Sequence, residues 1–310
     1  MDNTQLQSYK KQSQIFADQS EEHQELAETW FDETTADFWL HNRMYEAVDC
    51  IADKSSSWLT VGDGRWGLDA IRIKKRGFHH VHPTDLCETL LQKSKERGLI
   101  ETYSIENVEK LSFEDNSFDY VFCKESYHHF PRPYIALYEM LRVASKAVFL
   151  AEPNDEAMAP SVKDRDWFWF KFQALFRKLK LIHKLPVHYR KQVIFGSKGY
   201  EESGNFVYSI SKREAEKLML GLNYPQLAYK EMNTHYIKGC EYEPADYIKS
   251  TIFKELVDTI HDEDERCAKG WNVPNLILLG LFKEKMDDET RTLFQNKGWA
   301  IIDLPRNPYL

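Results

Sequence analysis

The sequence predicts one doubly wound α/β fold with a mostly parallel sheet of seven strands. Three observations support this fold class. Short apolar strands alternate with amphipathic helices from about residue 57 to residue 153. A glycine turn of the form G-x-G-x-x-G, made by Gly62, Gly64 and Gly67, joins the first strand to its helix. A further helix and two further strands follow between residues 211 and 284.

Five strands are expected before residue 154, because apolar runs there end at turn-forming or polar residues. They span residues 57–61, 78–85, 100–106, 118–126 and 146–153. The helices between them span residues 67–77, 86–98 and 133–144. Gly77 and Gly98 are typical of helix C-termini, since glycine adopts the left-handed conformation without strain.

The ends of the chain follow other patterns. Apolar residues at three- and four-residue spacing up to about residue 52 predict a helical N-terminal cap. Toward the C-terminus we expect helices over 211–224 and 244–262, strands over 226–237 and 275–284, and a short element near 299–305. The expected division is a cap (1–54), a cofactor-binding half (55–153), an insertion (154–209) and the remainder of the domain (210–310).

Composition narrows the classes of function. The chain has 310 residues with a net charge of -8, which argues against general nucleic-acid binding. Its five cysteines are scattered, which is typical of reduced thiols in the cytoplasm. The N-terminus has no apolar signal core, and the apolar runs are too short to span a bilayer. We therefore expect a cytoplasmic globular protein.

The glycine turn and Asp85 together indicate an adenosine-containing cofactor. Glycines after a first strand let the backbone approach a ligand, and the following helix N-terminus favours negative charge. Asp85 ends the second expected strand, eighteen residues after Gly67, where a carboxylate can accept hydrogen bonds from both ribose hydroxyls. These features do not choose between NAD and S-adenosylmethionine, and the glycine spacing alone is a weak signal.

A longer segment favours S-adenosylmethionine. Residues 107–153 contain "NVEKLSF", "EDNSFDYVFCKESYHHF" and "ALYEMLRVA". This block resembles the class I S-adenosylmethionine-dependent methyltransferases, in particular the type 11 family. The resemblance covers about residues 58–153 and implies a Rossmann-like methyltransferase fold. Two departures concern the cofactor: Thr60 stands where the family usually has an acid, and Trp66 where it usually has a third glycine.

The resemblance also implies roles for particular residues in holding the cofactor. They are Gly62, Asp63 and Gly64 at its methionine end, Asp85 at the ribose, Leu86, Asn107 and Val108 at the adenine, and Lys124 and Glu125 toward the methionine moiety and the reactive pocket.

Methyl transfer to a hydroxyl needs a base, and two histidines are candidates. His128 and His129 follow the fourth expected strand at the carboxyl edge of the sheet, and imidazole titrates near neutrality. The alternative is that these rings pack in the strand-to-helix turn. Tyr127 is a candidate for shaping the acceptor pocket. His79, His80 and His82 lack companion ligands at suitable spacing, so no metal site is expected.

The insertion contains a basic and aromatic segment. Residues 163–191 hold nine Lys or Arg against two Asp, a net charge of +7. Trp169, Phe172, Phe176 and Leu179 would share one stripe of a helix. This helix could pack on the sheet, cover an acidic or phosphorylated acceptor, or lie on an anionic membrane surface. Trp169 is taken as a candidate acceptor contact.

The leading hypothesis is an S-adenosylmethionine-dependent methyltransferase acting on a small molecule. The atom favoured is oxygen, in a sugar, a nucleotide-linked sugar or another biosynthetic intermediate. An NAD-dependent oxidoreductase and a non-catalytic cofactor-binding scaffold remain as alternatives.

Overall fold

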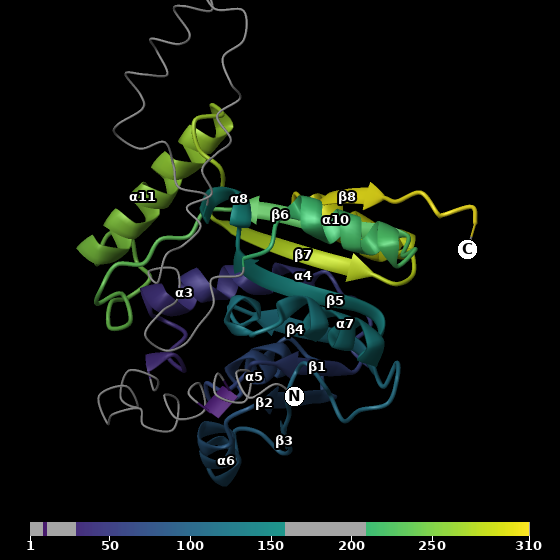
Figure 1. Cartoon of the computed structure of the whole chain (residues 1–310). Helices are drawn as coiled ribbons and strands as arrows, with labels where there is room; N and C mark the ends of the chain where they lie inside the picture. Colours follow the sequence, from purple (N-terminus) through teal and green to yellow (C-terminus); the bar gives the residue numbers. More distant parts are fainter. Residues whose placement is uncertain (1–8, 11–28, 159–208, 310) are drawn as a thin grey trace, which may run out of the picture.

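The computed structural model describes residues 9–10, 29–158 and 209–309, which form one sheet with helices on both faces (Figure 1). The sheet has the strand order β3-β2-β1-β4-β5-β7-β6-β8. Its strands are β1 (Trp58–Val61), β2 (Val81–Asp85), β3 (Ser104–Ile105), β4 (Phe118–Lys124), β5 (Ala144–Pro153), β6 (Gln226–Met232), β7 (Leu276–Phe282) and β8 (Ala300–Asp303).

The first five strands pair in parallel, and the last three add an antiparallel part. β7 pairs antiparallel with both β5 and β6, and β8 pairs antiparallel with β6. The doubly wound α/β fold is therefore confirmed. The described part of the chain has eight strands rather than the seven expected, because the tail after Trp299 pairs from Ala300 to Asp303 with the outer side of β6.

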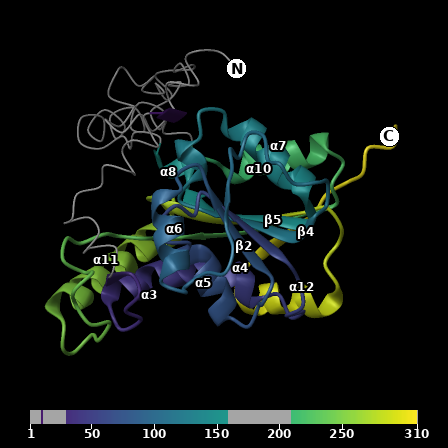
Figure 2. The ribbon, with the colours of Figure 1, turned by 90° about the horizontal axis from the view of Figure 1, so that it is seen from below.

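Helices cover the two faces of the sheet in separate groups. They are α3 (Ala36–Asn42), η1 (Arg43–Tyr45), α4 (Glu46–Asp49), α5 (Leu68–Lys75), α6 (Thr89–Glu96), η2 (Tyr127–His129), α7 (Pro133–Val143), α8 (Asp155–Met158), α10 (Lys212–Gly221), α11 (Thr251–Ala268) and α12 (Asp288–Asn296). Figure 2 shows α7 and α10 over one face, and α4, α5 and α12 over the other. α3 packs against α11 beside the sheet, through Leu40, Phe253 and Leu256.

Each face of the sheet has its own hydrophobic core. Trp58 is fully buried on the face of α4 and α5, with its ring centroid 4.7 Å from that of Tyr120 and 5.1 Å from that of Phe78. On the other face, Leu137 of α7 and Met219 of α10 are fully buried against the strands. Large aromatic side chains contribute strongly to the stability of such cores.

Several expected boundaries were wrong. The helix expected at 244–262 is α11, which starts later because the Ser250 side chain accepts a hydrogen bond from the backbone N–H of Phe253. The third strand is reduced to Ser104–Ile105, and the strand expected at 226–237 ends at Met232. The N-terminal cap contains short helices between Ala36 and Asp49 rather than long ones in its described part.

The insertion expected at 154–209 lies mostly outside the described residues, and so do Trp169 and the basic segment 163–191. Among the helices in the described ranges, none combines the length and the apolar character needed to cross a membrane.

Candidate functional site

The glycine turn after β1 requires glycine for both conformation and space. Gly62 has φ +70° and Gly67 has φ +65°, in the left-handed region that favours glycine. A Cβ atom at Gly62 would lie 2.5 Å from the Cβ of Ser126, which follows β4. Trp66 is also left-handed, at φ 64°, and its side chain is buried. The residue found in place of a third glycine therefore packs in the core.

Asp63 stabilises the turn instead of facing the cleft. Its carboxylate accepts hydrogen bonds from the backbone N–H groups of Asp69 and Ala70, both at 3.0 Å, at the start of α5. The Thr60 hydroxyl donates a third, at 2.7 Å. The Asp63 side chain is thus engaged by the start of α5 and by Thr60 and does not line the cleft, and its place at the methionine end of the cofactor stays a prediction. Thr60, at the unusual non-acidic position, serves the same network.

Asp85 lies at the end of β2, against the glycine turn. Its carboxylate accepts a hydrogen bond from the backbone N–H of Cys87 at 2.7 Å, with further backbone hydrogen bonds from Gly64 and Leu86. Burial raises the pKa of Asp85 to about 6, against the effect of these hydrogen bonds. A Cβ atom at Gly64 would lie 2.7 Å from the Asp85 carboxyl carbon, so only glycine fits beside this carboxylate.

A cleft opens at the carboxyl ends of β1, β2 and β4. The predicted cofactor residues that line it are Gly62, Asp85, Leu86, Asn107 and Val108, and His129 lines it as well. The lining residues that sequence reasoning missed are Tyr9, Val61, Thr84, Cys87, Glu106, Ser126 and Phe130. Most of these residues lie one or two positions from a predicted residue in the sequence. The expected ends of the strands could therefore have indicated them.

Asn107 forms a local turn at one end of the cleft. Its side-chain oxygen accepts a hydrogen bond from the backbone N–H of Glu109 at 2.9 Å. This bond fixes the side chain, because an Asn that bonds the backbone two residues ahead closes an Asx turn. Val108, between them, contributes a buried apolar side chain to the cleft.

Glu152, at the end of β5, orders the segment after β4. It is fully buried, and its Oε1 atom accepts hydrogen bonds from the backbone N–H groups of Ser126 at 2.8 Å and Tyr127 at 2.9 Å. Its Oε2 atom lies 2.6 Å from Nδ1 of His128. The rings of His128 and His129 pack together with centroids 3.9 Å apart. Sequence reasoning missed Glu152, although an acid at the end of a buried strand was a usable signal.

The predicted role of Tyr127 finds no support in its position. Its side chain is 1% exposed and packs in the hydrophobic core on the α7 face, beside Phe130. The short helix η2 turns this ring inward, whereas His129 in the same helix lines the cleft.

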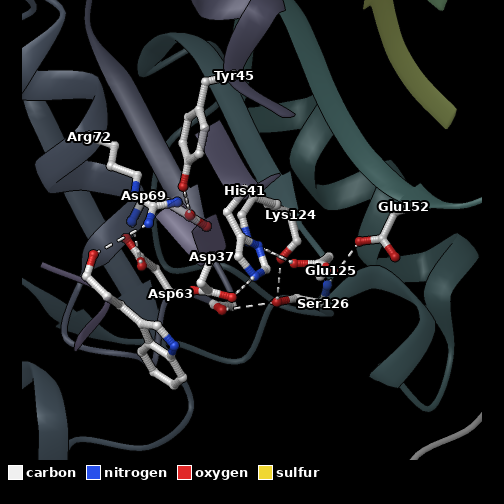
Figure 3. A network of polar contacts seen from close by, with 12 residues as sticks. Asp37, His41, Tyr45, Asp63, Asp69, Arg72, Lys124, Glu125, Ser126 and Glu152 are labelled. Atoms are coloured by element: carbon white, nitrogen blue, oxygen red, sulfur yellow. Dashed lines mark hydrogen bonds and ion pairs between the residues drawn. The ribbon is translucent and has the colours of Figure 1, made fainter. Parts of the chain in front are cut away.

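Lys124 and Glu125 lie near the N-terminal cap rather than along the cleft. Lys124 Nζ is 2.8 Å from Oε2 of Glu125, and that oxygen is also 3.3 Å from Nδ1 of His41 in α3 (Figure 3). The other ring nitrogen of His41, Nε2, is 3.4 Å from Oδ1 of Asp37. Neither Lys124 nor Glu125 lines this cleft, and their role toward the methionine moiety and the reactive pocket stays a prediction. Sequence reasoning missed His41 and Asp37, because nothing local in α3 indicates a partner on β4.

No group of three His, Cys, Asp or Glu side chains within residues 9–10, 29–158 and 209–309 is arranged to hold a metal ion. The described part of the site consists of a cleft with a half-buried carboxylate, a glycine turn, apolar walls and one histidine at its edge.

Comparison with known proteins finds a matching domain model and a similar protein. Residues 59–151 match the family model described as a methyltransferase domain. A demethylmenaquinone methyltransferase of Staphylococcus aureus (strain MRSA252) is 32% identical over 150 residues, which cover 46% of this chain and 60% of that protein. This chain thus aligns with less than two thirds of the length of that relative.

Solved structures are similar to this chain at low sequence identity. The YcgJ protein from Bacillus subtilis has a TM-score of 0.40 and 16% identity, covering 75% of this chain and 94% of that chain. The [4+2]-cyclase SpnF has a TM-score of 0.44 and 16% identity, covering 76% of this chain and 78% of that chain.

Proposed function

We propose, from the match of residues 59–151 to the methyltransferase domain model, that the protein transfers a methyl group from S-adenosylmethionine to a small molecule. The acceptor atom that we propose is oxygen, in a sugar, a nucleotide-linked sugar or another biosynthetic intermediate. The observation that carries the proposal is the presence of the Asp85 carboxylate in the same cleft as Gly62, since it places a hydrogen-bond acceptor near a glycine backbone that a ligand can approach closely.

The residues of the cleft suit S-adenosylmethionine. Asp85 would accept hydrogen bonds from the ribose hydroxyls, and Gly62 would allow the methionine end to approach the turn. Leu86 and Val108 offer apolar contacts for the adenine, and Asn107 a polar one. When bound, the cofactor supplies a methyl group activated by a positively charged sulfur.

The contribution of the chain itself is to hold the acceptor in line and to accept its proton. His129 lines the cleft, so we propose that it takes the proton from the acceptor hydroxyl. His128 is held by the buried Glu152 and would support the orientation of His129 through the contact between their rings. The acceptor would be excluded from bulk water by the elements around the carboxyl edge of the sheet.

The experiment that tests this function is calorimetric titration of the full chain with S-adenosylhomocysteine and with NAD. We expect binding of S-adenosylhomocysteine and none of NAD. Binding of NAD alone would refute the proposal in favour of an oxidoreductase, to which the G-x-G-x-x-G spacing also points. Transfer of label from methyl-labelled S-adenosylmethionine to a metabolite would then exclude a non-catalytic scaffold.

The two histidines are tested separately. His129→Ala is expected to reduce the rate of methyl transfer by about 100-fold or more, which is typical for loss of a general base. His128→Ala should have a smaller effect. Wild-type turnover of His129→Ala would refute its role as the base.

A further inference from the structure

One side chain of the cleft comes from the N-terminal part of the chain. Tyr9 lines the cleft, whereas the other lining residues all lie between Val61 and Phe130. Tyr9 is only 9% exposed, so other residues enclose it almost completely. It also lies outside residues 59–151, which match the methyltransferase domain model. The proposed function gives Tyr9 no role.

The Tyr9 hydroxyl lies at the end of the cleft that contains Asn107. Burial and then Glu109 raise the pKa of Tyr9 above its usual value, whereas Asn107 and Arg132 act to lower it. An uncharged side chain such as Asn107 affects a pKa only from close by, so it lies beside this hydroxyl. Asn107 and Val108 are the residues proposed above for the adenine. The Tyr9 hydroxyl is therefore placed where the adenine would bind.

The carboxylate of Glu109 is engaged by another residue. Glu109 is buried, and its Oε1 atom accepts a hydrogen bond from the backbone N–H of Arg132 at 2.9 Å. Its Oε2 atom accepts one from Nε of Arg132 at 2.6 Å, and a second guanidinium nitrogen contacts the same oxygen. Glu109 thus lies near enough to Tyr9 to raise its pKa, but no hydrogen bond of normal geometry joins the two side chains.

The Tyr9 hydroxyl is a buried donor without an acceptor. None of the residues that the structure describes makes a hydrogen bond of normal geometry with it. Its raised pKa keeps it protonated at neutral pH, so it has a hydrogen to donate. A buried hydroxyl that makes no hydrogen bond is unfavourable, and such groups are uncommon in native proteins. A ligand in the cleft that presents an acceptor atom would provide the missing bond.

We propose that Tyr9 is a cofactor-binding residue whose hydroxyl donates a hydrogen bond to the adenine ring. The edge of adenine carries ring nitrogens that accept hydrogen bonds, so its chemistry matches this donor. The inference rests on the proposed function, because it needs an adenosine-containing cofactor in the cleft. Tyr9 then adds a contact from the N-terminal part of the chain to those made by residues of the matched domain.

Tyr9→Phe tests the contact, because it removes the hydroxyl and keeps the ring. Calorimetric titration of the full chain compares this variant with wild type for S-adenosylhomocysteine and 5′-methylthioadenosine. The second ligand keeps the adenine and the ribose but lacks the amino-acid end. We expect Tyr9→Phe to weaken both ligands by the same factor of about 5- to 10-fold, the order expected for one hydrogen bond between neutral groups.

The two ligands separate the possible results. Affinities within about twofold of wild type for both ligands would refute the inference. Weaker binding of S-adenosylhomocysteine with unchanged binding of 5′-methylthioadenosine would also refute it, because Tyr9 would then contact the amino-acid end. If wild type binds neither ligand, the proposed function fails, and the inference fails with it.

The melting temperature without ligand distinguishes a binding role from a structural one. Tyr9→Phe removes a hydroxyl that makes no hydrogen bond, so the melting temperature should stay within about 2 °C of wild type or rise. A structural role predicts a lower melting temperature with both affinities unchanged.

Tyr247→Phe is the matched control for the loss of a tyrosine hydroxyl. The Tyr247 hydroxyl donates a hydrogen bond to Oδ1 of Asp258 in α11 at 2.6 Å, at an exposed position outside the cleft. This variant should bind S-adenosylhomocysteine and 5′-methylthioadenosine as wild type does.

Discussion

Gly64→Ala is expected to weaken cofactor binding by displacing the Asp85 carboxylate. The new methyl group would lie 2.7 Å from the Asp85 carboxyl carbon and 2.8 Å from each carboxyl oxygen, which is closer than Cβ contacts in proteins allow. Gly64 is not among the residues with positive φ, so its backbone accepts alanine. The strain therefore falls on Asp85 and on its hydrogen bond from the backbone N–H of Cys87 at 2.7 Å.

The magnitude follows from the hydrogen bonds of that carboxylate. A hydrogen bond to a charged group contributes about 1.5–3 kcal/mol. Because Asp85 would have to turn away from the ribose hydroxyls, we expect the affinity of Gly64→Ala for S-adenosylhomocysteine to fall by about 10- to 100-fold. The free energy of unfolding should change by only about 1 kcal/mol, since the carboxyl group is the end of a side chain that can shift.

Isothermal titration with S-adenosylhomocysteine measures this effect, and urea denaturation measures the stability of the same variant. Gly221→Ala is the control, because no atom lies within 4 Å of its added methyl group and it is at the end of α10. It should bind S-adenosylhomocysteine as wild type does. An affinity of Gly64→Ala within about twofold of wild type would show that Asp85 does not hold the ribose.

Two further predictions concern the buried carboxylates. The pKa of Asp85 is raised by burial to about 6, so the ionised form that accepts the ribose hydroxyls is lost as the pH falls below that value. Affinity for S-adenosylhomocysteine should then drop toward about tenfold per pH unit, whereas Asp85→Asn should show a flat profile; a flat wild-type profile from pH 7.5 to 5 would contradict this. Glu152→Ala should lower the free energy of unfolding by about 3 kcal/mol or more, because it leaves the N–H groups of Ser126 and Tyr127 and the ring of His128 without their acceptor. Urea denaturation measures this change, and a loss below about 1 kcal/mol would contradict it.

The sequence predicted which strand ends form the site better than it predicted the hydrogen bonds of the polar side chains there. Alternating strands and helices place Gly62 and Asp85 at one edge of the sheet, because the carboxyl ends of parallel strands meet there. Asp63 looked equivalent to its neighbours in the loop, yet it caps α5. Whether Asp63 faces the cleft or caps α5 depends on the direction of its short side chain, and the spacing of residues in the loop does not reveal that direction.

The side chains after β4 depart from strand alternation for a backbone reason. Strand alternation ends at Glu125, whose positive φ redirects its side chain toward α3, and η2 then turns Tyr127 into the core. His41 was missed because it pairs with Glu125, a residue far away in the sequence. Pairing of this kind depends on the assembled sheet, so local patterns cannot indicate it.

The position of β7 has a consequence for how the protein is made. β7 lies between β5 and β6, and its seven residues are all buried, yet it begins 123 residues after β5 ends at Pro153. At a synthesis rate of about 5–20 residues per second, the edge of β5 stays unpaired for roughly 6–25 seconds before synthesis of β7 begins. During that time the nascent chain presents an apolar strand without its neighbour, the condition under which chains associate incorrectly. The yield of folded protein in cells should therefore depend on the rate of translation between residues 153 and 282. It should also depend on the chaperones that bind the nascent chain during that interval.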